Sequence, residues 1–326
     1  MNMLKDQFGR TIDYMRISVT DRCNLRCRYC MPRGIERMPM AEILSYEEIA
    51  FVCTQAAALG IDRFRITGGE PLVRKDCTTL VSMLKRIPGV RRVALTTNGV
   101  LLAEHLDGLL EAGLDAVNIS LDTTDREQYQ AITGMDELER VMASVRLAAG
   151  KLPVKINCVV QRGVNEDAPV PLAALARDLP VDVRFIELMP IGAAKDMQTV
   201  PNAEVLGRIE ERIGKAEEDP GPRGSGPAVY RRLKEFSGRI GFISAVHGQF
   251  CGTCNRLRLT STGELKPCLC YGDVIPLREI LRDGEGGKEE RIREKIMEAV
   301  QSKPMAHCFE HRENITENRE MVRIGG

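Results

Sequence analysis

The feature that most constrains the fold is an alternation of two kinds of segment between residues 15 and 189. Short runs rich in β-branched residues alternate with longer segments of helical periodicity. The runs predict strands at 15–20, 63–67, 91–97, 115–121, 154–161 and 181–188. Strands that alternate with helices form parallel sheets. Six such units are too few for a closed eight-stranded barrel, so we expect an α/β fold with a partial (β/α)6 barrel of the TIM type.

The helical segments and the chain beyond them predict the domain organisation. Helices are expected at 45–59, 74–86, 103–111, 137–149 and 167–177, the first with a capping box formed by Ser45 and Glu48. The run PGPRGSGP at 220–227 predicts a loop or hinge. We therefore divide the chain into a partial barrel, 1–215, and a C-terminal region, 216–326. That region should hold a strand at 239–244 and a charged helix near 289–301, whose charges we interpret as a solvated face.

Composition excludes several classes of function. The 46 basic and 46 acidic residues give a net charge of zero, so nothing global attracts nucleic acid or an anionic membrane. The first 16 residues lack the apolar core of a secretory signal, and no membrane-spanning stretch follows. We expect a cytoplasmic protein without nucleic-acid or membrane partners.

Eleven cysteines remain to be explained, and their odd number argues against a disulfide framework. Cys23, Cys27 and Cys30 form C-x3-C-x2-C directly after the first predicted strand. Three thiolates on one loop can ligate three irons of a [4Fe–4S] cluster and leave the fourth iron open to a small molecule. A zinc site with a fourth ligand, or buried thiols, are the alternatives. Cys53 and Cys158 lie in apolar segments and are expected to fill the core.

A second cysteine group, Cys251, Cys254 and Cys268, has the pattern C-x2-C-x13-C. On spacing alone a zinc site and an iron–sulfur cluster are about equally supported. Cys270, two residues further on, would complete a closed four-cysteine zinc site.

The first triad, with Tyr29 before its third cysteine and GGEP at 68–71, resembles the radical S-adenosylmethionine enzymes. In that family the open iron chelates the amino and carboxylate groups of S-adenosylmethionine, and electron transfer yields a 5′-deoxyadenosyl radical. The resemblance implies that Tyr29 and Gly69 contact S-adenosylmethionine and that Glu70 shapes the same loop.

A more specific resemblance covers essentially the whole chain. Both triads, the run NRLRLT at 255–260, the stretch DQFGRTIDYMRISVTDRCNLRCRYCMP at 6–32 and the tail Gly325-Gly326 resemble the GTP 3′,8-cyclase family of molybdenum cofactor biosynthesis. The resemblance implies two [4Fe–4S] clusters, the second of which binds the guanine of GTP. Cys270 departs from the family pattern, and we interpret it as a bystander thiol.

The resemblance also implies roles for individual residues. Ser120 and Met189 would contact S-adenosylmethionine. GTP would be held by Arg16, Arg65, Thr96, Lys155, Arg256, Leu257 (through its backbone) and Arg258. Cys23, Cys27, Cys30, Arg256, Arg258, Gly325 and Gly326 would form the catalytic set. The chain has no G-x-x-x-x-G-K-[ST] loop, so local cations must hold the triphosphate. Charged residues at inward positions of a barrel-like sheet favour such a role.

In that family the radical removes hydrogen from C3′ of the ribose, and C3′ then attacks C8 of guanine. The expected product is (8S)-3′,8-cyclo-7,8-dihydroguanosine 5′-triphosphate, in the first step of molybdopterin synthesis. Implied partners are GTP, an electron donor of the flavodoxin or ferredoxin type and the downstream cyclic pyranopterin monophosphate synthase, and a homodimer is left open. The alternatives are a radical enzyme that modifies peptides with an auxiliary cluster, and a non-enzymatic zinc or iron–sulfur module.

Overall fold

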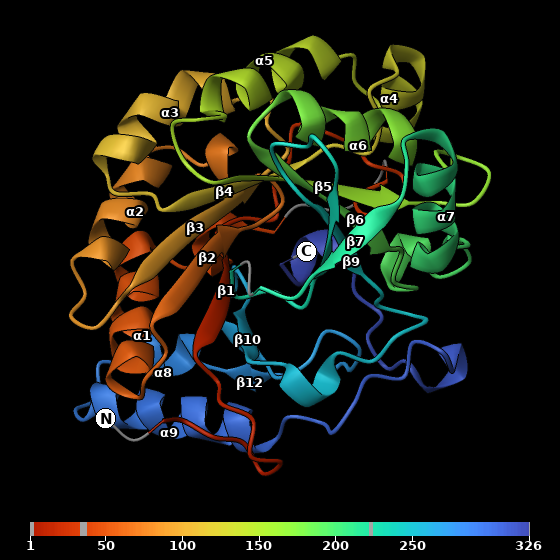
Figure 1. Cartoon of the computed structure of the whole chain (residues 1–326). Coiled ribbons are helices and arrows are strands. Elements are labelled where there is room, and N and C mark those ends of the chain that lie inside the picture. The colour runs from red at the N-terminus through yellow and green to blue at the C-terminus, as the bar shows by residue number, and fades with distance from the viewer. Residues whose placement is uncertain (1–2, 33–37, 222–223, 326) are drawn as a thin grey trace.

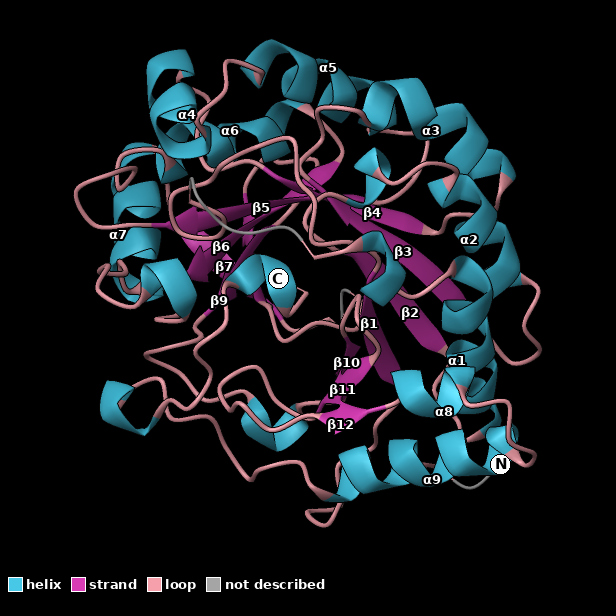
Figure 2. Ribbon diagram, turned by 180° about the vertical axis from the view of Figure 1, so that it is seen from behind, coloured by secondary structure: helices cyan, strands magenta, loops and turns pink. Residues whose placement is uncertain are grey.

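The computed structural model describes residues 3–32, 38–221 and 224–325. In these residues one sheet of twelve strands curves into an open barrel, and helices cover its outer face (Figures 1 and 2). Its strand order is β12-β11-β10-β1-β2-β3-β4-β5-β6-β9-β8-β7. The first six strands confirm the predicted runs to within two residues at either end: β1 Tyr14–Ser18, β2 Arg63–Thr67, β3 Arg92–Thr97, β4 Ala116–Ser120, β5 Val154–Val160 and β6 Val181–Glu187.

Helices link the successive parallel strands β1 to β6, as the alternating pattern predicts. The predicted helices are α1 Tyr46–Ala58, α2 Cys77–Lys85, α3 Leu102–Glu111, α5 Leu138–Ala148 and α6 Pro169–Asp178. The capping box is confirmed, because Ser45 Oγ accepts from the Glu48 amide and Glu48 Oε2 accepts from the Ser45 amide. Helix α2 begins three residues later than predicted, since Asp76 has a left-handed backbone (φ 57°).

Two helices of the barrel were missed because they are short of apolar residues. Helix α4 (Arg126–Thr133) follows the N-cap Asp125 and ends at Gly134 in the left-handed conformation. Helix α7 (Asn202–Arg212) buries little more than Val205 and Ile209. Neither segment carries a wide apolar stripe that a sequence pattern could reveal.

The C-terminal region extends both edges of the six-stranded core. On one side β10 (Arg256–Leu259) pairs parallel with β1, and β11 (Glu264–Lys266) and β12 (Ile275–Pro276) follow antiparallel. On the other, β9 (Ile240–Ile243) pairs parallel with β6, followed by antiparallel β8 (Val229–Leu233) and β7 (Ala216–Asp219). The strand predicted at 239–244 is confirmed. One sheet therefore continues across the predicted division at residue 215, which stays a prediction.

The core lies between the sheet and the outer helices. Cys53 and Cys158 are fully buried in it, as predicted. Two C-terminal helices, α8 (Arg278–Arg282) and α9 (Lys288–Gln301), pack near α1 (Figure 1). Helix α9 exposes charged residues but also buries Ile292 and Ile296. Its solvated face is therefore one side of an amphipathic helix.

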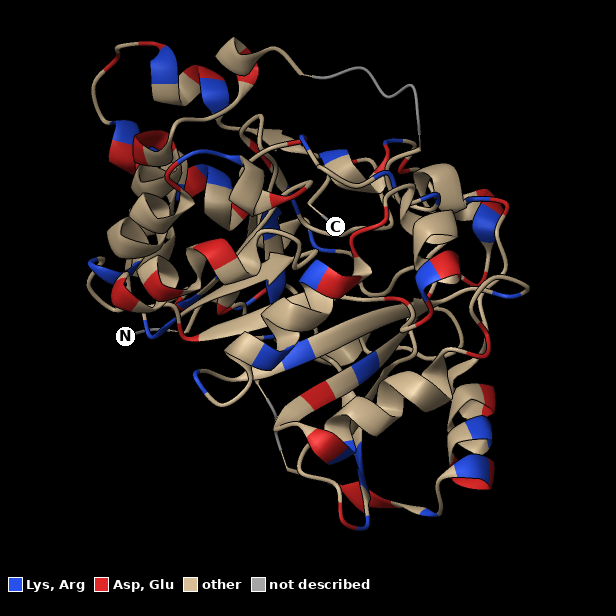
Figure 3. Ribbon diagram, turned by 90° about the horizontal axis from the view of Figure 1, so that it is seen from above, with Lys and Arg blue, Asp and Glu red and all other residues tan. Residues whose placement is uncertain are grey.

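The outer surface carries both signs of charge. Figure 3 shows acidic and basic residues interspersed over the helices and loops, in keeping with the net charge of zero. Among the described residues, every helix is too short or too polar to cross a membrane.

Candidate functional site

The loops that leave the carboxyl ends of the first six strands surround a cavity at the first cysteine triad. Cys23, Cys27 and Cys30 line it together with the four residues implied to contact S-adenosylmethionine, which are Tyr29, Gly69, Ser120 and Met189. Ser120 is the last residue of β4, and Met189 follows β6. The structure thus brings all seven predicted residues to one cavity, here called the first-triad cavity.

Two glycines after β2 let this loop pack directly on the cysteine loop. A Cβ atom on Gly69 would lie 2.4 Å from the carbonyl oxygen of Arg22, and one on Gly68 would lie 2.8 Å from that of Thr20. Because neither residue has a Cβ atom, the two loops come close enough for the Gly69 amide to donate to the Thr20 carbonyl at 2.7 Å. The GGEP motif is therefore explained by close backbone approach, which only glycine permits here.

Glu70 joins the loops after β2 and β3. Its fully buried carboxylate accepts hydrogen bonds from the Asn98 amide (2.6 Å), the Thr97 hydroxyl (2.7 Å) and the Leu72 amide (3.0 Å). Burial raises its pKa to about 7, although these bonds oppose the rise. Asn98 Nδ2 also lies 3.7 Å from Cys23 Sγ. The backbone amide of Glu70 also donates to the Arg22 carbonyl at 2.8 Å. Glu70 therefore holds the cysteine loop both directly, through its backbone, and through Asn98.

Tyr29 is tied to the strand ends on the far side of the cavity. Its hydroxyl donates to Asp122 Oδ2 at 2.9 Å, and Asp122 Oδ1 accepts from the Val159 amide at 2.8 Å. Burial raises the pKa of Asp122 to about 6. Asp122 lines the cavity and was not singled out from the sequence.

The thiols of the first triad suit an iron–sulfur cluster. Burial, chiefly, raises the pKa of Cys23 to about 11 and that of Cys30 to about 12, so a bound metal must supply the charge that favours thiolates. In the described part of the chain no three cysteine, histidine or carboxylate side chains converge on one point.

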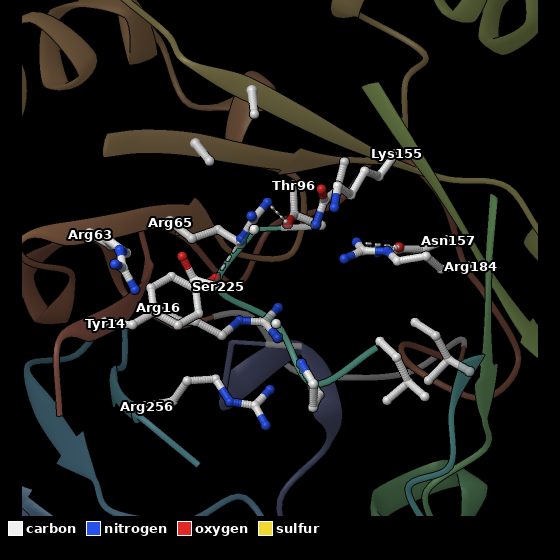
Figure 4. A pocket seen from close by; sticks show the side chains of 18 of the residues that line it. Tyr14, Arg16, Arg63, Arg65, Thr96, Lys155, Asn157, Arg184, Ser225 and Arg256 are labelled. Carbon is white, nitrogen blue, oxygen red and sulfur yellow. Dashed lines mark hydrogen bonds between the residues drawn. The ribbon is translucent and has the colours of Figure 1, made fainter. Parts of the chain in front are cut away.

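A second cavity lies beside the first and is strongly basic (Figure 4). Among the described residues, its lining contains no carboxylate. It is lined by eight cationic side chains, namely Arg16, Arg63, Arg65, Arg92, Lys155, Arg184, Arg256 and Arg258. Thr96 also lines it, so six of the seven residues implied to bind GTP meet there.

Burial, and to a lesser extent the repulsion of neighbouring cations, lowers the pKa of two of these side chains. Burial lowers the pKa of Lys155 to about 7, and the neighbouring Arg184 adds to the effect. Burial and Arg256 lower the pKa of Arg258 to about 10. Cations that repel one another in a buried cavity are stabilised by an anion, so this basic cavity favours a ligand with several negative charges.

Leu257, the seventh residue, lies on β10 between the two arginines. Its side chain is fully buried in the main core and does not line the basic cavity. Side chains alternate along a strand, so Arg256 and Arg258 face the cavity where Leu257 cannot. Only its backbone remains available for the contact that the resemblance implies.

Several further polar residues that line the basic cavity were not selected from the sequence, among them Tyr14, Arg63, Arg92, Asn157 and Arg184. Arg63 shares its facing with Arg65, as strand alternation predicts. Arg184 donates to Asn157 Oδ1 at 2.8 Å, across the β5–β6 pair (Figure 4). The available signal for Arg184 was a basic residue in the middle of a predicted barrel strand, VDVRFIE.

The second triad lines a third cavity. Cys251, Cys254 and Cys268 meet there with Phe250, Arg256 and Arg258. Burial would raise the pKa of Cys254, but the cations of Arg256 and Lys303 outweigh it and lower the pKa to about 7. The lowered pKa favours the thiolate form of Cys254, which is the form that binds metal.

Cys270 is fully buried and does not line the second-triad cavity. Its sulfur instead lies 3.0 Å from that of Cys308. This position agrees with a bystander thiol rather than with a fourth ligand of the triad.

The three cavities adjoin one another. Met189 and Arg258 line all three, and Phe250 and Arg256 line both the basic cavity and the second-triad cavity. A ligand in the basic cavity is therefore next to the cavities of both cysteine triads.

The C-terminal tail enters the barrel (Figures 1 and 2). Gly325 has a left-handed φ of 76°, and a Cβ on it would lie 3.3 Å from Ser18 Cβ. Its carbonyl accepts from Arg258 Nη1 at 2.6 Å. Gly326 lies outside the described residues.

A buried ion pair anchors the chain leading to this tail. Lys266 on β11 pairs with Glu317, and both side chains are nearly fully buried. Arg319 also pairs with Glu317, at 3.0 Å, and with Glu264 at 2.7 Å. These pairs hold the tail against the strands that carry Arg258.

Comparisons with known proteins agree with this arrangement. Residues 17–176 match the Radical SAM superfamily, and residues 181–309 match the family described as Molybdenum Cofactor Synthesis C. The chain is 46% identical over 329 residues to the GTP 3′,8-cyclase of Pelotomaculum thermopropionicum, covering 99% of this chain and 100% of the relative. It is also 46% identical over 328 residues to the GTP 3′,8-cyclase of Moorella thermoacetica, with the same coverage.

Among solved structures, Streptococcus suis SuiB bound to S-adenosylmethionine superposes with a TM-score of 0.65 at 15% identity, over 96% of this chain and 77% of that one. This likeness confirms the fold. The sequence relationship goes further, because it extends at high identity over nearly the full length of both chains. The protein therefore belongs to the GTP 3′,8-cyclase family of radical S-adenosylmethionine enzymes.

Proposed function

We propose that the protein is a GTP 3′,8-cyclase that converts GTP to (8S)-3′,8-cyclo-7,8-dihydroguanosine 5′-triphosphate. The observation that carries this proposal is a basic cavity that adjoins the cavities of both cysteine triads. A single ligand there can present one part to each triad while its phosphates meet the cations.

The first-triad cavity is proposed to hold a [4Fe–4S] cluster on Cys23, Cys27 and Cys30, with S-adenosylmethionine beside it. When bound, these groups supply a 5′-deoxyadenosyl radical. The chain itself contributes position. The Tyr29–Asp122 hydrogen bond and the Glu70 network hold the cysteine loop rigidly against the strand ends.

The basic cavity is proposed to hold the triphosphate, which carries about four negative charges and suits forked guanidinium donors. Arg65 is already oriented, because its Nε donates to the Tyr14 hydroxyl at 2.5 Å. Arg184 is held in the same way by Asn157. Such pre-orientation reduces the entropy lost on binding and fixes the ribose relative to the first triad.

The second triad is proposed to hold the other [4Fe–4S] cluster, with guanine directed toward it. Arg256 and Arg258 border both this cavity and the basic one. The carbonyl of Gly325 orients the Arg258 guanidinium. We propose that the Gly325-Gly326 tail contributes to catalysis through this arginine.

The test is an assay of the anaerobically reconstituted protein with S-adenosylmethionine and a reductant. We expect 5′-deoxyadenosine formation that depends on GTP, together with a product of the same mass as GTP. Arg184→Ala should raise the KM for GTP, whereas Arg177→Ala, which removes an exposed arginine paired with Asp178, should not. Cleavage of S-adenosylmethionine with GTP unchanged would instead favour a peptide-modifying enzyme.

The remaining partners belong to the same proposal. An electron donor of the flavodoxin or ferredoxin type would reduce the clusters, and the downstream cyclic pyranopterin monophosphate synthase would consume the product. Eleven free cysteines support a reducing, cytoplasmic location. A homodimer and the division at residue 215 are tested together by sedimentation of the full chain and by limited proteolysis.

A further inference from the structure

Lys303 is a buried lysine next to the second triad, just beyond α9. Its relative exposure is 2%. Its Nζ donates to the carbonyl oxygens of Arg256 (2.7 Å) and Pro267 (2.9 Å) and lies 3.8 Å from Cys254 Sγ. Neither the resemblance nor the comparisons assign a role to this residue.

The contacts of Lys303 match the donors of an ammonium group. An ammonium carries three N–H donors, and here three acceptors surround it, two carbonyls and one sulfur. A buried cation is costly unless negative charge lies close to it. Thiolates of the second triad supply such charge, so the site makes physical sense when those cysteines hold a metal cluster.

Through these two carbonyls Lys303 contacts both chain segments that carry Cys254 and Cys268. Arg256 follows Cys254 by two residues, and Pro267 immediately precedes Cys268. One side chain therefore joins the segments that carry two of the three thiols. The third thiol, Cys251, accepts from the backbone amide of His307 at 3.3 Å.

We infer that Lys303 is a positioning residue of the second cluster, which holds two of its ligand segments together and stabilises its reduced form through an N–H···S hydrogen bond. The inference rests on the proposed ligation of that cluster by Cys251, Cys254 and Cys268. Hydrogen bonds to ligand sulfurs and nearby positive charge favour the more negative, reduced state of a cluster and so raise its reduction potential.

The test measures the reduction potential of the second cluster in the full-length protein. Replacing all three cysteines of the first triad by alanine leaves only the second cluster to be titrated anaerobically and followed by electron paramagnetic resonance. In this background Lys303→Met should lower the equilibrium constant for reduction at least tenfold, or about 59 mV for a one-electron couple. Lys303→Arg, which keeps a charged donor, should restore at least part of the shift.

Lys266→Met combined with Glu317→Leu is the matched control. It removes a second fully buried lysine together with its buried partner, so that no unpaired buried charge is left. The Nζ of Lys266 bonds to the Tyr271 carbonyl and to Glu317 but to no cysteine sulfur among the described residues, so this double variant should leave the potential unchanged. An unchanged potential in Lys303→Met, or an equal shift in the double variant, would overturn the inference.

Iron content separates the remaining outcomes. Loss of iron in Lys303→Met but not in Lys303→Arg or in the Lys266→Met/Glu317→Leu double variant would support the positioning role directly. Loss of iron in all three variants would show that Lys303 contributes only to general packing, and would overturn the inference. Failure of the proposed ligation is distinguishable, because Cys251→Ala/Cys254→Ala/Cys268→Ala would then keep its full iron content whatever Lys303 does.

Discussion

The depressed pKa of Lys155 predicts that the affinity for GTP depends on pH. Its side chain on β5 is 12% exposed, and its Nζ lies 2.8 Å from the Tyr230 hydroxyl and 3.7 Å from Asp182 Oδ2. Burial and the neighbouring Arg184 lower its pKa from 10.5 to about 7. Above that pH the free enzyme holds an uncharged amine in a cavity proposed to bind a triphosphate.

The size of the effect follows from linkage. A bound triphosphate favours the ammonium form, so binding above pH 7 must take up a proton. The affinity then falls by at most tenfold for each pH unit, which is about 1.4 kcal/mol per unit. At pH 7 half of the Lys155 side chains are already uncharged, so between pH 7 and pH 9 the limiting loss is about fiftyfold, and it is smaller if the pKa in the complex lies below 9.

Stability should change in the opposite direction. Between about 7 and 10.5 the unfolded chain keeps the Lys155 proton that the folded protein has lost. The unfolded state therefore binds more protons, and the contribution of this residue to the free energy of unfolding rises with pH across that window. With rising pH the affinity for GTP should therefore fall while the contribution of Lys155 to stability rises. General alkaline damage would instead lower both.

The assay is equilibrium binding of GTP from pH 6.5 to 9 without S-adenosylmethionine, in the wild type and in Lys155→Arg. The arginine keeps its charge throughout this range, and titration of the nucleotide affects both proteins equally. We expect a steeper loss of affinity in the wild type. Equal slopes in the two proteins would refute the reasoning.

Three other substitutions test separate parts of the site. Gly325→Ala places a Cβ at a left-handed φ and close to Ser18, which should disfavour the docked tail by about 1–2 kcal/mol and lower turnover without loss of iron; a kcat equal to that of the wild type would contradict this. Glu317→Gln leaves the Lys266 cation without its buried partner and should cost about 3–5 kcal/mol, seen as a lower Tm, whereas Lys266→Met combined with Glu317→Leu should recover most of the loss. Cys270→Ser should keep both clusters by iron analysis, because that thiol contacts Cys308 rather than the second-triad cavity; loss of about half the iron would identify it as a ligand.

The barrel and most of the site were accessible to sequence reasoning because they depend on local patterns. The six parallel strands follow β-branched runs, and GGEP sits where a strand ends. The first triad and its neighbours meet because carboxyl ends of parallel strands lie at one edge of the sheet. Arg63 and Arg65 are two residues apart on β2 and both line the basic cavity, which is what strand alternation predicts.

Long-range pairing was not accessible in the same way. Nothing local indicates that NRLRLT is a strand beside β1, with Arg258 opposite Arg16. Lys303 was equally hidden, because a lysine after a charged helix gives the pattern of a solvated residue while the fold buries it among carbonyls. Lys266 and Glu317 could not be recognised as buried residues either, because the burial of each charge depends on its ion pair with the other, 51 residues away in the sequence.

The pairing of β1 with β10 affects how the chain folds during its synthesis. Strand β1 obtains one neighbour from residues 63–67, but its other neighbour is separated from it by more than 230 residues. During synthesis β1 is therefore an exposed edge strand with unpaired backbone groups for almost the whole time that the ribosome is at work. Chains that terminate before residue 256 should aggregate rather than accumulate as a stable barrel. They lack β10, so the backbone groups along one edge of β1 stay unpaired and can pair with another chain. The two halves of the proposed site, Arg16 and Arg258, come together only in that late step.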